Sequence, residues 1–334
     1  MNQWSTRLDA LPRLSLAAEP TPIHRATRLR ASLGGPELWL KRDDLLPIGF
    51  GGNKVRSLGL VVADALRQGA DVIITGAGPL SNHVRASAAI AAIMGLRCEV
   101  VYWGEPPQRA EGNHLLTRML GADIDFTGDA DRCSVDRGVD VLAAEHRRRG
   151  EKFYCIPRGG ACPLAVLAHV LAVRETLDQL ARLDARPDII FMAVGGGATL
   201  AGWLLGTALF GASWRLESIT VSRPSDEALS RAKRLAMEAA DLIGCAADLQ
   251  DVEVAVHDGF IGDGYGAPSN EGQEAIALAA RAEGVFFDPV YTGKAMAGYR
   301  ALIAQGRFER VRTALFLHTG GAPGLFTASV EKML

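Results

Sequence analysis

The sequence predicts an α/β protein with two open, mostly parallel twisted sheets and flanking helices. Short β-branched runs alternate with segments of helical period nearly from end to end, which is typical of parallel strands joined by helical crossovers. The 334 residues are long for one core and suit two domains of roughly 100 to 200 residues each. The 37 glycines exceed the usual share of about 7% and indicate many tight turns between the elements.

The first series of elements covers about residues 58–160. A strand at 71–78 runs into a glycine turn, and a helix begins at Ser81 and ends at Gly95. Glycine is the residue that most often ends a helix. The series continues with a strand, a helix, a strand, a charged helix and a short apolar run, which we place at 98–103, 112–120, 122–128, 136–150 and 152–157.

The second series covers residues 161–334. Its predicted helices are at 163–183, 198–211, within 225–243, at 270–284 and after Tyr291, and its strand-like runs are at 188–194, 216–221, 252–258, 285–290 and 313–321. A strand at 37–44 has no partner in the first series, so we expect it to pair with the second. The larger domain would then be discontinuous (1–57 and 161–334), with a smaller domain at 58–160.

Composition excludes several classes of function. A formal net charge of −2 gives no basic field for nucleic acid or for a polybasic membrane anchor. No apolar run reaches the 18 or so residues of a membrane span, and the opening lacks the apolar core of a signal peptide. We therefore expect a soluble, cytoplasmic protein. The five cysteines are scattered without a C-x-x-C pair, so we predict reduced, mostly buried thiols and no metal site.

The stretch GFGGNKVRSL at 49–58 sets three glycines and Asn53 before Lys54, where a helical pattern begins. A lysine at a helix start faces the positive end of the helix dipole, which favours loss of its proton, and desolvation lowers its pKa further. A neutral amine is what a Schiff base requires. Taken singly, such a lysine is usually an ordinary surface residue.

A glycine turn that follows an apolar strand and opens a helix is a candidate phosphate site. Unpaired N–H groups and the helix dipole attract anions there. The dinucleotide pattern G-x-G-x-x-G is not matched. A turn without a ligand is the alternative interpretation. The candidate residues are Gly195, Gly196, Gly197, Ala198 and Thr199.

Two further turns follow strands in the same way. Ser81, Asn82 and His83 open a helix and can present N–H and hydroxyl groups to a small carboxylate, although helix capping alone also explains them. Thr319 ends an apolar run before two glycines, where a simple turn is again the alternative. Because ligands of parallel sheets bind at the carboxyl ends of the strands, these turns and Lys54 together are more specific than any one alone.

Two tyrosines complete the candidate site. Tyr265 lies in the glycine-rich loop 257–272, which is poor core material and is therefore expected to be functional. Tyr291 precedes a polar turn and a helix. Their phenols can donate or accept protons, whereas a packing role is the alternative for either tyrosine alone.

Eight motifs in order, from about residue 20 to 326, resemble one family, the fold-type II pyridoxal-phosphate enzymes that include D-cysteine desulfhydrase and 1-aminocyclopropane-1-carboxylate deaminase. The resemblance implies a tryptophan-synthase-β-like fold with pyridoxal 5'-phosphate between the domains, and a homodimer. The motifs are LWLKRDDL, GGNKVRSL, SNHVRASAA, IPRGGA, AVGGGATLAG, GYGAPSNEG, DPVYTGKAMAG and HTGGAPGLF.

The resemblance also implies roles for single residues. Lys54 would bond to the cofactor aldehyde beside Asn53, Asn82 would contact the ring hydroxyl, and the turn Gly195 to Thr199 would hold the phosphate. Thr319 or Thr292 would lie near the pyridine nitrogen. The substrate site would comprise Ser81, Asn82, His83, Arg158 and Gly159, with Tyr265 and Tyr291 as the active-site phenols.

By this resemblance we expect α,β-elimination of a small amino acid, D-cysteine first, to pyruvate, ammonia and hydrogen sulfide. Thr292 stands where the deaminase pattern has glutamate, which favours elimination over ring opening. Leu80 replaces a usual glutamine, Trp103 is nearer the deaminase pattern, and Arg158, with Cys162 and Pro163 after it, departs from the desulfhydrase pattern.

Arg158 is either a surface ion pair or a receptor for an extra anionic group such as a sulfonate. Cysteate sulfo-lyase, ring-opening deaminase and β-replacement synthase therefore remain alternatives. A cofactor-binding protein without turnover is an alternative of another class.

Overall fold

The larger sheet has six strands in the order β1-β2-β10-β7-β8-β9. The computed structural model describes residues 2–16 and 20–327. β1 is antiparallel to β2, and the other neighbouring strands are parallel. The strands are β1 (Ile23–Arg25), β2 (Glu37–Arg42), β7 (Ile189–Val194), β8 (Arg215–Thr220), β9 (Val254–His257) and β10 (Thr313–His318).

The smaller sheet has four parallel strands in the order β5-β4-β3-β6. They are β3 (Val72–Ala77), β4 (Arg97–Tyr102), β5 (Asp123–Phe126) and β6 (Phe153–Cys155). Every residue of β3 is buried, because α4 (Asn82–Met94) covers one face of the sheet and α6 (Ser134–Arg149) the other. A strand buried on both faces reads as a continuous apolar run, as residues 71–78 do.

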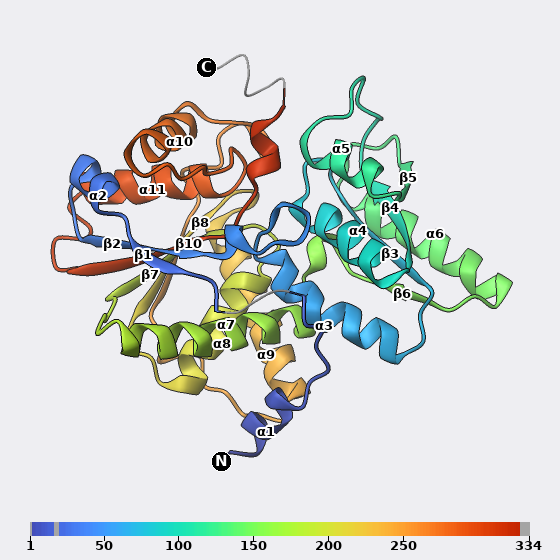
Figure 1. Cartoon of the computed structure of the whole chain (residues 1–334), viewed down its shortest axis with the longest axis horizontal. Helices are drawn as coiled ribbons and strands as arrows, with labels where there is room; N and C mark the ends of the chain where they lie inside the picture. The colour runs from blue at the N-terminus through green and yellow to red at the C-terminus, as the bar shows by residue number, and fades with distance from the viewer. Residues whose placement is uncertain (1, 17–19, 328–334) are drawn as a thin grey trace.

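Helices cover both faces of the larger sheet (Figure 1). Because alternate residues of a strand point to opposite faces, Phe191 and Ile190 of β7 contribute to two different apolar cores. One core includes α2 (Thr27–Leu33), α10 (Asn270–Glu283) and α11 (Thr292–Ala304), and the other includes α3 (Lys54–Arg67), α7 (Pro163–Arg182), α8 (Ala198–Phe210) and α9 (Ser225–Leu242). The remaining helices are α1 (Gln3–Asp9), α5 (Gly112–Met119) and the 3₁₀ turns η1 (Asp43–Leu45), η2 (Ile48–Phe50), η3 (Arg158–Gly160) and η4 (Ala322–Leu325).

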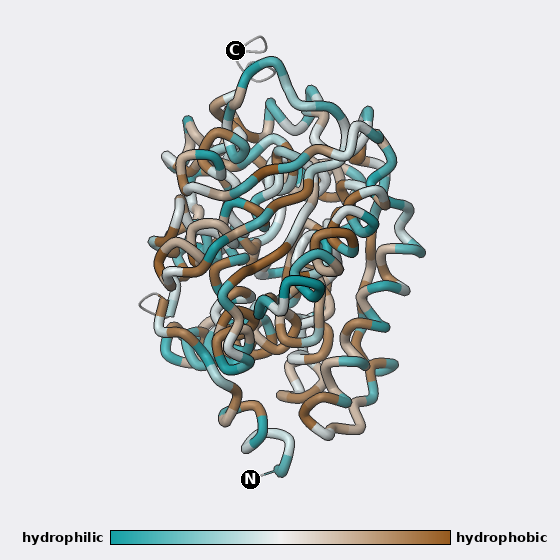
Figure 2. Tube along the Cα trace, turned by 90° about the vertical axis from the view of Figure 1, so that its right-hand side faces the viewer, coloured by the Kyte–Doolittle hydropathy of each residue, from teal (hydrophilic) through white to brown (hydrophobic). Residues whose placement is uncertain are grey.

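The predicted α/β class with two mostly parallel sheets is confirmed. The strand expected at 37–44 does return to the second series, since β2 pairs in parallel with β10 and Leu40 lies opposite Phe316. Figure 2 shows hydrophobic segments crossing the middle of the molecule, as buried strands require. The domain boundary at 57/58 stays a prediction, and it falls inside α3.

The apolar run at 285–290 forms no strand, unlike the other runs of its series. The side chain of Asp288 accepts hydrogen bonds from the backbone N–H groups of Val290, Tyr291 and Thr292. These bonds turn the chain into α11 before it can extend along a neighbour. An aspartate that bonds the backbone shortly after it competes with strand formation in this way.

The long helix α7 is strongly apolar. By length and composition the segment Arg158–Arg182 meets the requirements for crossing a membrane, but 61% of its apolar window is buried inside the protein. There α7 packs mainly against α3 and α8. Core helices of soluble proteins pass the same test, so the segment is weak evidence for a membrane span.

Candidate active site

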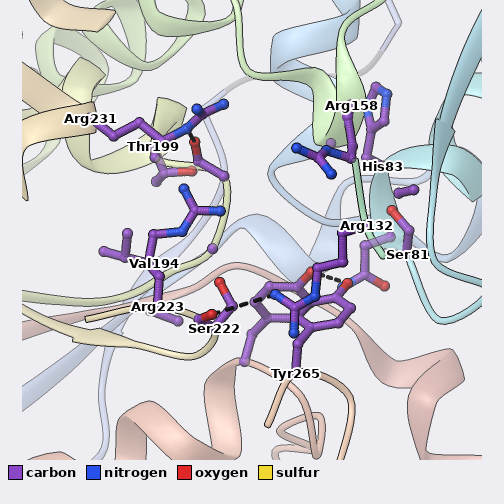
Figure 3. A pocket seen from close by; sticks show the side chains of 18 of the residues that line it. Ser81, His83, Arg132, Arg158, Val194, Thr199, Ser222, Arg223, Arg231 and Tyr265 are labelled. Carbon is purple, nitrogen blue, oxygen red and sulfur yellow. Dashed lines mark hydrogen bonds between the residues drawn. The ribbon is translucent and has the colours of Figure 1, made fainter. Parts of the chain in front are cut away.

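A cavity of about 550 Å³ lies at the carboxyl ends of strands from both sheets. It lies where ligands of parallel sheets usually bind. The structure brings most of the predicted site residues to its wall, and Figure 3 shows several of them pointing inward. The predicted residues that line it are Asn53, Lys54, Ser81, Asn82, His83, Arg158, Gly159, Gly195, Gly196, Gly197, Thr199, Tyr265, Tyr291 and Thr319.

Lys54 is the first residue of α3. Within the described residues its amine makes no hydrogen bond and no ion pair. Burial lowers the pKa of this amine to about 8, although the nearby Cys162 thiol acts in the opposite direction. A far larger fraction of this amine than of an ordinary lysine is therefore neutral near physiological pH, although most of it is still protonated there.

The glycines before Lys54 allow two loops to approach closely. Gly52 has φ +103°, and a Cβ on Gly320 would lie 2.6 Å from the Gly52 Cα. The Asn53 N–H donates a 3.0 Å hydrogen bond to the Thr319 carbonyl. Side chains at either glycine would force the loops apart, so the glycine-rich sequence fixes Lys54 beside the end of β10.

The glycine turn after β7 contacts the same region. A Cβ on Gly195 would lie 2.9 Å from the Tyr291 ring, so the close approach of that ring requires glycine. Gly197 precedes the first turn of α8, whose leading N–H groups have no partner within the helix. The Asn53 amide donates a 2.9 Å hydrogen bond to the Thr199 hydroxyl. This bond joins the loop before Lys54 to the glycine turn.

A chain of polar side chains orients the start of α4. Ser81 caps the helix by accepting a hydrogen bond from the Val84 N–H at 3.4 Å. The Asn82 side-chain oxygen accepts from Asn113 at 2.9 Å, and the Asn113 oxygen accepts from Arg85 at 2.7 Å. The Asn82 amide N–H₂ group is therefore left without a partner among the described residues, and it can donate to a bound group.

His83 is buried and faces the cavity. Its Nε2 lies 2.9 Å from the Thr75 hydroxyl, and its Nδ1 has no hydrogen-bond partner among the described residues. Burial, with a smaller effect of Lys54, lowers the pKa of His83 to about 3. The imidazole is thus neutral near pH 7, and its unpartnered Nδ1 faces Gly160, where a Cβ would lie 2.5 Å from that nitrogen.

Tyr265 and Tyr291 meet in the cavity wall beside the glycine turn. Their hydroxyl oxygens lie 2.7 Å apart. Burial raises the pKa of both phenols, and their mutual contact raises the pKa of Tyr291 further. Both phenols therefore stay protonated near neutral pH and can donate a proton.

Thr292, Ala198 and Leu80 do not line the cavity. Thr292 is fully buried, and its hydroxyl donates to the Asp288 carboxylate at 2.7 Å and accepts from the Asp288 N–H at 2.8 Å. A place for Thr292 beside a cofactor ring therefore has no support in this arrangement. Ala198 is buried at the start of α8, and Leu80 lies against Gly266.

Several lining residues were missed by sequence reasoning. Asp131 and Arg132 lie in the loop before α6, and Ser222, Arg223, Glu227 and Arg231 follow β8. The position of Arg223 just beyond a buried parallel strand was the one available signal. The other side chains reach the cavity from loops and from α9, where no local pattern marks them. Within the described ranges, no three His, Cys, Asp or Glu side chains form a metal-binding group.

Comparison with known proteins gives consistent results. Residues 14–320 match the family described as pyridoxal-phosphate dependent enzyme. A D-cysteine desulfhydrase of Salmonella typhi is 39% identical over 324 residues, which cover 96% of this chain and 97% of the relative. A solved ACC deaminase homologue is 33% identical with a TM-score of 0.89, covering 98% and 97% of the two chains. A solved threonine deaminase, 19% identical with a TM-score of 0.66 over 96% and 97% of the chains, shares the fold.

Proposed function

Because the chain belongs to the pyridoxal-phosphate dependent enzymes, we propose that it is a lyase carrying out α,β-elimination on a small amino acid, D-cysteine in the first instance. The products would be pyruvate, ammonia and hydrogen sulfide, with one water consumed. The observation that carries the proposal is Lys54, an unpartnered amine with a pKa of about 8 in the wall of a cavity that also contains the glycine turn. The choice of D-cysteine rests on the relatives at 39% identity.

The residues of the cavity fit the cofactor. The free N–H groups at the start of α8 suit its phosphate, and the Lys54 amine suits its aldehyde. The unpartnered Asn82 amide group suits the ring hydroxyl. The Thr319 hydroxyl, which makes no hydrogen bond among the described residues, suits the ring nitrogen. When bound, pyridoxal phosphate withdraws electrons from the substrate α-carbon and so permits loss of its proton.

The protein's own groups would bind the substrate and move its protons. Ser81 and the N–H groups at the start of α4 attract the α-carboxylate, helped by the helix dipole. The neutral His83 side chain adds no positive charge to this wall of the cavity. The Lys54 Nζ accepts the α-proton. The Tyr291 hydroxyl, held by Tyr265, donates a proton to the leaving sulfur.

Thr292 supports elimination over opening of a cyclopropane ring. The deaminase pattern has glutamate at this position. In this chain the position is Thr292, which is buried and bonded to Asp288, away from the cavity wall. The residue directly after Tyr291 is therefore not a carboxylate that could serve as an extra acid or base. We also propose a cytoplasmic homodimer, which sedimentation of the purified protein and fractionation of cells would test.

A screen for keto-acid release tests the function. D-cysteine, L-cysteine, cysteate and 1-aminocyclopropane-1-carboxylate are each incubated with the cofactor-loaded protein, and pyruvate, 2-oxobutyrate and sulfide are measured. We expect pyruvate and sulfide from D-cysteine. Release of 2-oxobutyrate alone would favour the deaminase, and no product from any substrate would favour a cofactor-binding protein without turnover.

A further inference from the structure

Four arginines from separate segments line the cavity. Arg132 precedes α6, Arg158 begins η3, Arg223 follows β8, and Arg231 lies on α9. Figure 3 shows Arg231 beside Thr199 and Arg158 beside His83, with their guanidinium groups pointing toward one another across the cavity. Arg132 and Arg158 belong to the segment of the smaller sheet, and Arg223 and Arg231 to that of the larger one.

The charge of these arginines is poorly matched by carboxylates. Among the described residues, Arg132 and Arg231 form no ion pair with a carboxylate. Arg158 pairs with Asp136 at 3.2 Å, but 52% of the Asp136 side chain is exposed. Arg223 lies 3.7 Å from Glu227, which is 61% exposed. Exposed pairs of this kind are weak.

An excess of positive charge therefore faces the cavity. In the part of the chain that the structure describes, its lining holds the four arginines and two carboxylates, Asp131 and Glu227. The excess is two positive charges before Lys54 is counted. The pKa of Arg223 is lowered by burial and by the neighbouring Arg132 and Arg158, and the pKa of Arg231 by burial and by Arg223, Arg234 and Arg158, while Glu227 raises both in part. This repulsion is what a bound anion would relieve.

The arginines also hold unused donors. The Arg158 Nη1 and the Arg223 Nε are buried without a hydrogen-bond partner among the described residues, and the Arg223 Nε faces Glu227 at 3.7 Å. Arg231 is oriented by its Nε, which donates to the Gly196 carbonyl at 2.9 Å. Arg132 lies over the Tyr265 ring at 5.2 Å and donates to the Ser222 carbonyl at 3.4 Å. Guanidinium groups present several N–H donors in a planar fork that matches tetrahedral oxyanions.

We infer that Arg132, Arg158, Arg223 and Arg231 form a second anion subsite, and that beyond D-cysteine this enzyme takes amino acids whose β-substituent is a tetrahedral oxyanion, a phosphate ester before a sulfonate. The inference rests on the proposed elimination function and names its substrate class. Four guanidinium groups attract the doubly charged phosphate more strongly than the singly charged sulfonate. A thiol, which carries no oxygen and little charge, would leave these donors unsatisfied.

The chemistry balances for both oxyanions. With O-phosphoserine, the α-carbon loses its proton, the Cβ–O bond breaks and phosphate leaves with the bonding electron pair. The remaining fragment takes up one water and yields pyruvate and ammonia. With cysteate, the Cβ–S bond breaks in the same way and sulfite leaves. No oxidant or reductant is needed.

The cofactor phosphate alone does not account for the cluster. The N–H groups at the start of α8 already suit that phosphate. Arg231 contacts the glycine turn through the Gly196 carbonyl, whereas Arg158 lies beside His83, on the side of the predicted substrate-carboxylate site (Figure 3).

Substrate comparison with matched variants tests the subsite. Pyruvate release is measured for both enantiomers of O-phosphoserine, cysteate and cysteine, using cofactor-loaded wild type, Arg223→Met, Arg223→Lys and Arg158→Met. Arg300→Met is the control, because Arg300 is exposed on α11 and pairs with the exposed Glu274 of α10. Inorganic phosphate is also titrated into the cofactor-loaded protein by calorimetry, and cofactor retention is measured for each variant.

We expect kcat/KM for O-phosphoserine to exceed that for D-cysteine at least tenfold, with cysteate between them. Arg223→Met and Arg158→Met should each reduce the O-phosphoserine value at least ten times more than the D-cysteine value, and Arg223→Lys should reduce it less. Phosphate should bind to wild type and to Arg300→Met, and more weakly to Arg223→Met.

Two outcomes would overturn the subsite. One is turnover of D-cysteine with no preference for either oxyanion and no phosphate binding, which would leave the elimination function standing. The other is an equal loss for all substrates with loss of cofactor from the arginine variants, which would assign the arginines to the cofactor. If no amino acid yields pyruvate, the elimination function fails. In that case, phosphate binding that Arg223→Met weakens would still support the anion subsite. Absence of phosphate binding would reject the subsite as well.

Discussion

The side-chain amide of Asn53 donates a 2.9 Å hydrogen bond to the hydroxyl of Thr199. Asn53 immediately precedes Lys54, and Thr199 lies in the first turn of α8. The bond therefore links the lysine to the glycine turn, although 146 positions separate the two residues. A reactive amine and a phosphate site must be held at a fixed separation if one cofactor is to engage both.

Breaking this link should weaken cofactor binding. We expect Asn53→Ala to raise the dissociation constant for pyridoxal phosphate about fivefold, because a hydrogen bond of this kind contributes about 1 kcal/mol. Thr199→Val should have a similar or larger effect. The loss of binding free energy in the double variant should be smaller than the sum of the two single losses, since both substitutions remove the same bond. Full additivity, measured by equilibrium dialysis, would argue that the bond is unimportant.

The rate of covalent cofactor capture should depend on the charge of Lys54. The amine attacks an aldehyde when it is neutral, and its lowered pKa makes half of it neutral at about pH 8. The rate at which apoprotein takes up pyridoxal phosphate should therefore rise with pH, reach half of its maximum at about pH 8 and then level off. Stopped-flow absorbance measures this directly. A midpoint near the ordinary value of 10.5 would contradict a buried, unpartnered amine.

The tyrosine pair should matter for turnover more than for binding. Tyr291→Phe removes the proposed proton donor and should lower kcat by about 10²-fold to 10⁴-fold. Tyr265→Phe removes the partner that holds the donor and should lower kcat less. Tyr299→Phe is the control, because the Tyr299 hydroxyl is buried without a partner among the described residues. Equal kcat values for Tyr291→Phe and Tyr299→Phe would exclude the donor role.

Two threonines should behave differently when each is changed to valine. Thr292→Val removes both hydrogen bonds to Asp288 and should lower the free energy of unfolding by about 1 to 3 kcal/mol. Thr319→Val removes a hydroxyl that faces the cavity, so it should alter cofactor affinity with little effect on unfolding. Denaturant unfolding and cofactor titration of both variants separate the effects. The reverse pattern would place Thr292 beside the cofactor.

Much of the site was predictable because its signals are local. Glycines before Lys54, a serine cap at Ser81 and a glycine turn at Gly195 each follow from backbone chemistry within a few residues. The rule that ligands bind at the carboxyl ends of parallel strands then brings these segments together. The structure places all three in one cavity wall.

The features that sequence reasoning did not predict have a different origin. The direction of the Thr292 side chain is set by Asp288, whose carboxylate also prevents residues 285–290 from forming a strand. Arg132 and Arg231 were missed because each reaches the cavity from a segment without a pattern of its own. Their meeting depends on how the two sheets face each other, which a local pattern does not specify.

Identifying the lysine that carries the cofactor tests the central claim most directly. The protein is loaded with pyridoxal phosphate, treated with borohydride, digested and mapped by mass spectrometry. We expect the label on Lys54 and none on Lys294, whose amine donates to the Ile261 and Gly264 carbonyls. Label on Lys294 or on any other lysine, with Lys54 unmodified, would contradict the assignment on which the proposed function rests.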